Sequence, residues 1–308
     1  MVLTRLFRGW RAMLLGALLM SGILQVAVAT NSLVFCAQPA HLTAVQKDRL
    51  LIFGSVVRDV LDQSGRSVAI VSRSGIDLDR FSIRYSHSGI SLKNSPNTPW
   101  SVRQLYYACD AQKAKIFDQG LAGFVMDFDG RDIPFISLVF VPEPQGSEMI
   151  NSALDSKLAL SLLDPHYSGN AYAFSTIYQN CNQWVVEMLA HAWGHLDAGD
   201  DARAHAQQWL KDQHYQPTEV DVKHGYMVWL THLVPLLHND DHPADNLARN
   251  VYQVSMPGSI ESFVRSTLPG SSRVEVCMNQ TQVVVHHGWD ALPDQCIAGA
   301  GDEVIPLS

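Results

Sequence analysis

Residues 178–189 read YQNCNQWVVEML, and this stretch decides the fold because it has the pattern of an amphipathic helix. Its apolar residues recur at helical spacing, which predicts one buried face: Trp184, Val185, Met188 and Leu189. Cys181 begins the same stripe, and Asn180 or Asn182 can cap the free amides of the opening turn. The sequence therefore predicts a thiol at a helix N-terminus.

A thiol in that position is a candidate nucleophile. The unpaired N–H groups and the positive end of the helix dipole favour the thiolate, which is the reactive form of cysteine. Buried cysteines are also commonly inert. A catalytic role for Cys181 therefore requires a base within hydrogen-bond reach and a group that orients that base.

The N-terminus is predicted to be an export signal. Three arginines precede an uncharged run over residues 13–29, which ends in Ala27-Val28-Ala29. A basic flank, an apolar core and small residues at the exit are typical of a cleaved secretory signal. The alternative is an uncleaved membrane anchor, although the run is at the short limit of a spanning helix. We predict a periplasmic or secreted protein.

Composition excludes some functions. Removal of residues 1–29 would remove three arginines and no acid, which changes the formal charge from −8 to −11. Such an acidic chain lacks the clustered Lys and Arg that nucleic-acid binding needs, so we expect no nucleic-acid partner. A hydrophobic content of 47% is ample for a packed core, and the remaining residues could form one large domain or two small ones.

The five cysteines all follow the predicted signal, in a compartment that permits disulfides. Cys277 and Cys296 flank an expected hairpin, so we predict that they pair, and Cys36 with Cys109 is the next pairing. Cys181 would then be the free thiol.

The rest of the chain alternates between helical and strand patterns. Residues 43–62 should form a helix that opens with a capping box at Thr43 and Gln46. Residues 117–128 are ambiguous, and the residues from Gly299 onward are expected to be disordered. Further helices are predicted over 147–163, 202–213 and, with weaker signals, 227–237; strands are predicted over 67–72, 85–93, 100–107, 136–141, 220–222, 273–278 and 281–286.

His87 is the predicted base. Among thirteen histidines it stands inside a short strand, and Gly89 beside it leaves room for close approach of another backbone or a substrate. A histidine in a strand is also often a core residue with satisfied hydrogen bonds. The position of this histidine before Cys181 in the chain, taken with the resemblance described next, favours the catalytic interpretation.

The stretch YSHSGI at 85–90, a following strand with a polar inward residue, and Asn180-Cys181 at the start of a helix resemble a known superfamily. The pattern is similar to the circularly permuted branch of the NlpC-type, papain-like cysteine hydrolases, in which histidine precedes cysteine. The resemblance covers roughly residues 67–195. The whole exported chain is also similar to a bacterial family known only as a domain of unknown function.

The resemblance implies that Cys181 is the nucleophile and His87 its base. The third residue should lie on the strand after the histidine, which indicates Gln104; Arg103 and Gln179 are the fallbacks. Gln104 departs from the pattern, because an uncharged amide stabilises an imidazolium less than a carboxylate does. The backbone N–H of Cys181 or Asn182 could serve as an oxyanion donor.

Residues around these motifs are predicted to bind the substrate: Tyr85, Tyr178, Asn180, Asn182 and Trp184. Aromatic residues before Cys181 could line a cleft for an acyl chain or sugar, or could equally belong to the core: Tyr167, Tyr172, Phe174 and Tyr178.

Two histidine clusters raise the question of a metal. His191 and His195 share a helix face but lack the glutamate of zinc proteases. In residues 238–242, HNDDH, two carboxylates stand between two histidines and could hold a divalent ion through Asp240, Asp241 and His242, although a solvated turn ending at Pro243 is the favoured interpretation. We expect neither a metal nor a cofactor.

Together these patterns predict an α+β, papain-like core of the permuted NlpC type, with an antiparallel sheet packed against the cysteine helix. Its domains would be a signal at 1–29, the papain-like domain at 30–215, and a C-terminal elaboration at 216–308 with the hairpin and a disordered tail. The predicted function is a secreted thiol hydrolase or acyltransferase that acts on an amide or ester of cell-envelope peptides, glycans or lipids. The alternative is a non-catalytic envelope protein that binds a ligand in the same cleft.

Overall fold

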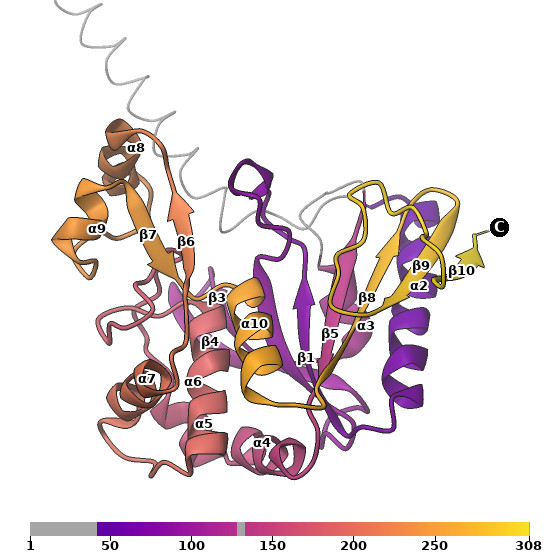
Figure 1. The fold of residues 1–308 in the computed structure, drawn as a ribbon, viewed down its shortest axis with the longest axis horizontal. Coiled ribbons are helices and arrows are strands. Elements are labelled where there is room, and N and C mark those ends of the chain that lie inside the picture. The colour runs from indigo at the N-terminus through magenta and orange to yellow at the C-terminus, as the bar shows by residue number, and fades with distance from the viewer. Residues whose placement is uncertain (1–41, 128–132, 308) are drawn as a thin grey trace, which may run out of the picture.

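A computed structural model describes residues 42–127 and 133–307. Within them, eight strands form one antiparallel sheet in the order β10-β9-β8-β5-β1-β2-β3-β4 (Figure 1). The strands are β1 (Val68–Arg73), β2 (His87–Leu92), β3 (Ser101–Ala108), β4 (Lys113–Gln119), β5 (Phe135–Phe140), β8 (Ser272–Met278), β9 (Gln282–His287) and β10 (Glu303–Pro306).

Helices cover both faces of this sheet (Figure 1). One face carries α4 (Gln145–Leu154), α5 (Ser156–Ser161), α6 (Cys181–Gly194), α7 (Ala202–Asp212) and α10 (Pro257–Thr267); the other carries α2 (Ala44–Gln63) and α3 (Leu121–Met126). Val68 and Ile70 of β1 pack in the first core, and Ala69 and Val71 pack in the second. Because side chains alternate along a strand, a continuous apolar run such as that of β1 indicates burial on both faces.

A smaller lobe stands at the upper left of Figure 1. It contains β6 (Thr218–Asp221) paired with β7 (Val251–Val254), together with α8 (Gly225–Leu230), α9 (Ala244–Ala248) and the 3-10 turn η2 (Thr231–Leu233). A second 3-10 turn, η1 (Asp79–Phe81), lies between β1 and β2. The lobe has its own apolar cluster, in which Tyr252, Val254 and Met256 are buried.

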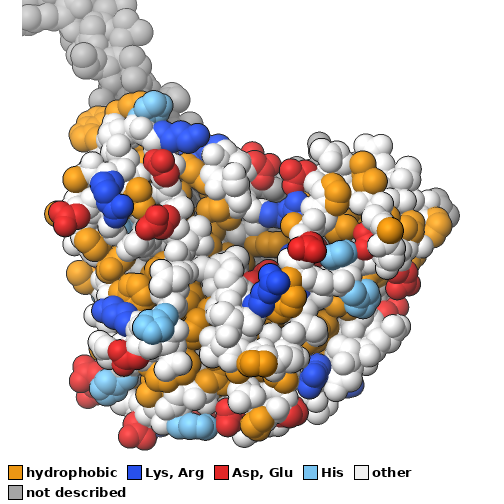
Figure 2. Space-filling view, in the orientation of Figure 1, with side chains coloured by type: hydrophobic (Ala, Val, Ile, Leu, Met, Phe, Trp, Pro, Cys, Tyr) orange, Lys and Arg blue, Asp and Glu red, His pale blue; other side chains and the backbone are white. Residues whose placement is uncertain are grey.

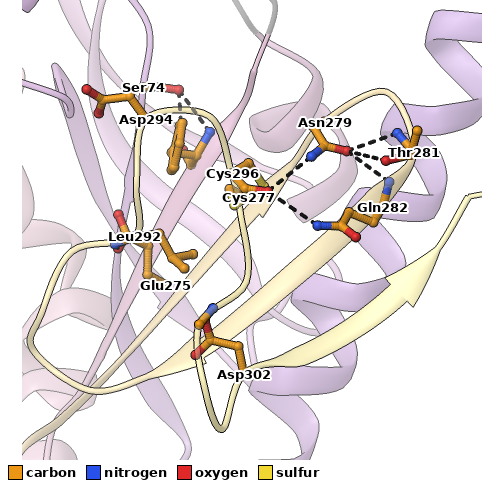
Figure 3. The surroundings of a disulfide bond; sticks show 12 residues. Ser74, Glu275, Cys277, Asn279, Thr281, Gln282, Leu292, Asp294, Cys296 and Asp302 are labelled. Carbon is orange, nitrogen blue, oxygen red and sulfur yellow. Dashed lines mark hydrogen bonds between the residues drawn. A yellow bond between two sulfur atoms is a disulfide. The ribbon is translucent and has the colours of Figure 1, made fainter.

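The disulfide between Cys277 and Cys296, with an S–S distance of 2.04 Å, confirms the predicted pairing. It joins β8 to the segment between β9 and β10, and Asn279 Nδ2 donates to the Cys296 carbonyl at 3.0 Å (Figure 3). Nearby, the backbone N–H of Leu292 donates to Glu275 Oε2 at 2.7 Å. The covalent bond and these contacts hold the returning chain against the sheet.

Most predicted elements are confirmed, including the capping box at Thr43 and Gln46. The ambiguous stretch 117–128 contains the end of β4 and α3. The expected helix over 147–163 is two helices, because Asp155 caps the second one with its carboxylate. The expectation of a disordered tail was wrong, because residues 303–306 pair with β9 as β10. The C-terminal strands thus extend the sheet that residues 68–140 begin.

Candidate functional site

Cys181 is the first residue of α6, as predicted, and its thiol is free. Asn180 is the N-cap, since its side-chain oxygen accepts from the Gln183 backbone N–H at 2.7 Å. Cys109 is disulfide-bonded, while Cys36, its predicted partner, lies outside the described residues. The structure therefore confirms Cys181 as the unpaired thiol and its position at a helix N-terminus.

Burial dominates the electrostatics of this thiol. Cys181 is 6% exposed, and burial raises its pKa to about 11. The positive charge of Arg73, the backbone N–H groups of Asn182 and Cys181, and the Tyr167 hydroxyl all act in the opposite direction. The helix N-terminus thus favours the thiolate as expected, but desolvation outweighs it, and the resting group at neutral pH is a neutral thiol.

His87 begins β2, and the structure brings it together with Gln104 of β3. Its Nε2–H donates to Gln104 Oε1 at 2.5 Å, and the Gln104 amide donates to Gln119 Oε1 at 2.6 Å. This chain of hydrogen bonds leaves Nδ1 of His87 as the acceptor. Burial, and secondarily the charge of Arg73, lowers the pKa of His87 to about 3, so the imidazole is neutral.

The first turn of α6 is fastened to β2 on both sides of His87. Ser88 Oγ donates to Asn182 Oδ1 at 2.9 Å, and Asn182 Nδ2 donates to the Ser86 carbonyl at 3.1 Å. Alternation along β2 turns Ser88 toward α6 and His87 toward the face of Phe124, whose ring centroid lies 6.0 Å from the imidazole. No hydrogen bond joins the Cys181 thiol to His87, although both side chains lie within the described residues.

Gly89 permits the close approach of β3. A β-carbon at this position would lie 2.5 Å from Val102 Cγ1 and 3.0 Å from the Arg103 carbonyl oxygen. The room that the sequence indicated beside His87 is therefore taken by the neighbouring strand.

Arg73 is a site residue that the sequence analysis missed. It is the last residue of β1, lies opposite His87 in the strand register, and is 5% exposed. Its guanidinium forms an ion pair with Asp127 at 3.0 Å and lies 5.5 Å from the centre of the Phe124 ring. Its charge acts on both Cys181 and His87. An arginine at the end of a buried strand, next to Ser74-Gly75, was the available sequence signal.

Tyr167 is the second unexpected neighbour of the thiol. Burial raises its pKa well above the usual range, and the interaction with Cys181 raises it further, so the hydroxyl keeps its proton. Its ring centroid lies 5.4 Å from that of Tyr107 on β3. Tyr167 therefore presents a hydrogen-bond donor to the sulfur. The sequence analysis, which left open whether Tyr167 lines a cleft or belongs to the core, did not predict this role.

The predicted third residue and its fallbacks occupy distinct places. Gln104 contacts His87, as described above. Arg103 forms a salt bridge with Asp118 at 2.6 Å, and Gln179 donates to Glu187 Oε2 at 2.6 Å inside the core. Both fallbacks are thereby engaged in structural contacts.

The five predicted substrate-binding residues are dispersed. Trp184 is fully buried and donates to the Ala159 carbonyl at 3.3 Å. The Tyr85 hydroxyl donates to Glu275, away from the thiol. Tyr178 stacks on His238 at 4.1 Å between ring centroids and bonds to Asp240. Asn180 serves as the helix cap, and Asn182 borders the strand that carries His87.

Parts of both histidine clusters are packed into the protein: His191, Asp241 and His242 are buried, whereas the His195 side chain is 72% exposed. The two ring nitrogens of His191 face the carbonyls of Leu196 and Ala202 at 3.2 and 3.0 Å. The expected turn is present at residues 240–241, and Asp240 is exposed. The turn is only partly solvated, because the side chains of Asp241 and His242 are fully buried and bond to the backbone of residues 170–172. Across 42–127 and 133–307, no three His, Cys, Asp or Glu side chains are grouped to hold a metal ion.

Fold and site together define an α+β protein with a large antiparallel sheet and a free, buried cysteine at the start of the helix that packs on it. The chain belongs to the family described as "Uncharacterized protein conserved in bacteria (DUF2145)", whose model matches residues 60–264. No curated protein and no solved structure matches the chain. The predicted similarity to an uncharacterised bacterial family is confirmed over residues 60–264, rather than over the whole exported chain, and this range includes Arg73, His87, Gln104, Tyr167 and Cys181.

Proposed function

We propose that this protein is a thiol hydrolase or acyltransferase of the papain-like type, with Cys181 as nucleophile, His87 as base and Gln104 as the group that orients the base. The observation that carries this proposal is the free thiol at the α6 N-terminus, which two backbone N–H groups and the Tyr167 hydroxyl approach. The His87–Gln104 hydrogen bond supports it, because that bond leaves Nδ1 free to accept a proton.

The chemistry must start from two neutral groups. With pKa values of about 11 for Cys181 and about 3 for His87, a preformed thiolate–imidazolium pair is disfavoured in the resting protein. Because His87 lies on the face of Phe124 while Ser88 faces α6, the mechanism requires a rearrangement at this end of β2. We propose that substrate binding causes it and brings the thiol within reach of His87 Nδ1. The thiol proton then moves to Nδ1 as sulfur attacks the carbonyl carbon and the C=O electron pair moves to oxygen.

The tetrahedral intermediate then collapses. The carbonyl re-forms, the bond to the amine or alcohol breaks, and that leaving group takes the proton from the imidazolium. Water or an acceptor nucleophile, deprotonated by His87, next attacks the thioester carbonyl. The C–S bond then breaks, the carboxylic acid or the acylated acceptor is released, and the sulfur takes the proton from the imidazolium, which regenerates the thiol. The backbone N–H groups of Cys181 and Asn182 and the Tyr167 hydroxyl are the donors available to the oxyanion.

The proposed substrates are amides or esters of the cell envelope. This choice of substrate class rests on the predicted export and on the resemblance to papain-like hydrolases. The disulfide between Cys277 and Cys296 is compatible with a location outside the cytoplasm. No helix in the described ranges is long and apolar enough to cross a membrane.

Replacing Cys181 by alanine should reduce hydrolysis of activated acyl esters and envelope peptides by about 10³-fold or more, because no acyl-enzyme can form. The measurement is the initial rate over a substrate panel, with a pre-steady-state burst as evidence of the thioester. Ser262→Ala, which changes an exposed residue of α10, is the matched control and should retain the wild-type rate. Full activity of the Cys181→Ala protein would rule out this mechanism.

The second candidate, a non-catalytic binding protein, is favoured by the neutral, buried state of both central groups. If that resting state is correct, iodoacetamide should label Cys181 slowly at pH 7, with a rate that rises only above about pH 9. Mass spectrometry of the labelled protein, with disulfides intact, gives the rate. Fast labelling at pH 7 that His87→Ala abolishes would instead show a preformed ion pair and contradict the neutral resting state.

A further inference from the structure

The smaller lobe ends in an exposed apolar stripe. Tyr226, Trp229 and Leu230 of α8 are 60%, 62% and 37% exposed. They are spaced three and four residues apart, which places them on one face of the helix. Val228, on another face, packs against the apolar cluster of the lobe. The stripe is therefore an outward face rather than an incomplete core, and Figure 2 shows hydrophobic side chains gathered at this end of the lobe.

The charge around the stripe differs from that of the rest of the molecule. The whole chain has a formal charge of −8, yet residues 222–239 contain no Asp or Glu. The same segment contains Lys223 and three histidines. Asp221 and the exposed Asp240 border the segment, and the Asp221 carboxylate accepts from the Lys223 backbone N–H at 2.7 Å. Within the segment itself, an anionic surface therefore meets one lysine and no carboxylate.

We propose that the tip formed by Tyr226, Trp229 and Leu230 docks on an anionic phospholipid bilayer. Trp and Tyr are the side chains that prefer the membrane–water interface, and Leu contributes apolar area below them. A helix of six residues is too short to present the i to i+7 anchors of a groove-binding helix, which favours a flat partner. This docking does not depend on the proposed chemistry of Cys181.

Vesicle flotation of the mature protein, without residues 1–29, tests the proposal. With vesicles of phosphatidylglycerol and phosphatidylcholine, the wild type should float, and pure phosphatidylcholine should bind roughly fivefold less protein, since Lys223 then lacks an anionic partner. For the double variant Trp229→Ser/Leu230→Ser, the amount of protein bound to the vesicles should fall by about tenfold or more. The matched control changes two apolar residues with 61% and 57% exposure elsewhere, Leu160→Ser/Ile297→Ser, and should bind like the wild type.

A second measurement guards against a variant that fails to fold. Trp229→Phe keeps the apolar stripe, so it should still float, but it should lose most of the fluorescence quenching that brominated lipids cause in the wild type. Equal flotation of the wild type and the double variant would overturn the proposal. A wild type that dimerises through the tip, with a monomeric double variant and no flotation of either, would assign the surface to a second copy instead and would also overturn it.

Discussion

Replacing Arg203 by methionine should lower the free energy of unfolding by about 3–5 kcal/mol. Arg203 of α7 forms an ion pair with Glu187 of α6 at 3.0 Å, where the Glu187 side chain is fully buried. Methionine fills much of the space but leaves that carboxylate without its cation. The remaining partners of Glu187 are the amides of Gln179 and Gln207, which carry no charge. Urea unfolding followed by circular dichroism measures the loss.

The same substitution should disturb the approach to Cys181. The Arg203 guanidinium also donates to the carbonyls of Ser175, Thr176 and Tyr178, at 3.2, 2.9 and 2.9 Å. These contacts fix the segment that leads into α6. We therefore expect faster proteolysis within residues 164–178 in the variant, because the segment loses its central anchor.

Two further variants make this prediction specific. Gln208→Met places the same side chain at an exposed position of α7 and should change stability by less than about 0.5 kcal/mol. Glu187→Leu/Arg203→Met removes the fully buried carboxylate together with its cation and should be more stable than Arg203→Met alone. Asp164, whose side chain is 16% exposed and also pairs with Arg203 at 2.9 Å, loses its cation in both variants, so the comparison isolates Glu187. A single Arg203→Met variant as stable as the wild type would show that the ion pair contributes nothing.

Protonation of His87 should destabilise the fold as the pH falls. The pKa of this imidazole is about 3 in the folded protein, while the unperturbed value is 6.5. Between these values the unfolded chain binds a proton that the folded protein does not, so stability decreases with decreasing pH. The contribution of His87 is fully present above pH 6.5, is lost progressively toward pH 3, and amounts to about 5 kcal/mol.

His87→Gln isolates this contribution, because glutamine stays neutral and other buried groups titrate in both proteins. Urea unfolding at intervals from pH 7.5 to pH 4 should show a shallower loss of stability in His87→Gln than in the wild type. His195→Gln, at a side chain with 72% exposure, should follow the wild type. Identical pH profiles for wild type and His87→Gln would mean that His87 remains easy to protonate.

Sequence patterns were most informative where the cause is local. The helix that starts at Cys181, the capping box at Thr43 and the hairpin around Asn279 each depend on neighbours a few residues away, and all three are present. The pairing of Cys277 with Cys296 was also predictable, because the hairpin brings those positions together. The contact of His87 with Gln104 follows from the pairing of adjacent strands.

The features that the sequence analysis missed depend on contacts between segments that are distant in the chain. Arg73 acts at the site because β1 lies beside β2, and Arg203 holds the segment before Cys181 because α7 packs on α6. The position of Arg73 at the end of an apolar strand was the one local signal, and the sequence around Arg203 resembles that of a surface arginine. The resting states of Cys181 and His87 were missed for the same reason, since desolvation depends on what covers each group. The tail was predicted to be disordered because the short run EVIP at 303–306, after a Gly-rich stretch, gave no sign of the β9 edge with which it pairs.

The segment that matches the family model does not contain every strand of the large sheet. The matched range, residues 60–264, contains β1 to β5 but ends before β8, which is the neighbour of β5 in the sheet. A fragment with those limits would expose the backbone donors and acceptors along one side of FISLVF, a strand whose residues are all buried in the complete chain. Such an apolar, unpaired edge is a template for association with other chains. Members that end near the matched limit would need another strand, from themselves or from a second molecule, to close the sheet.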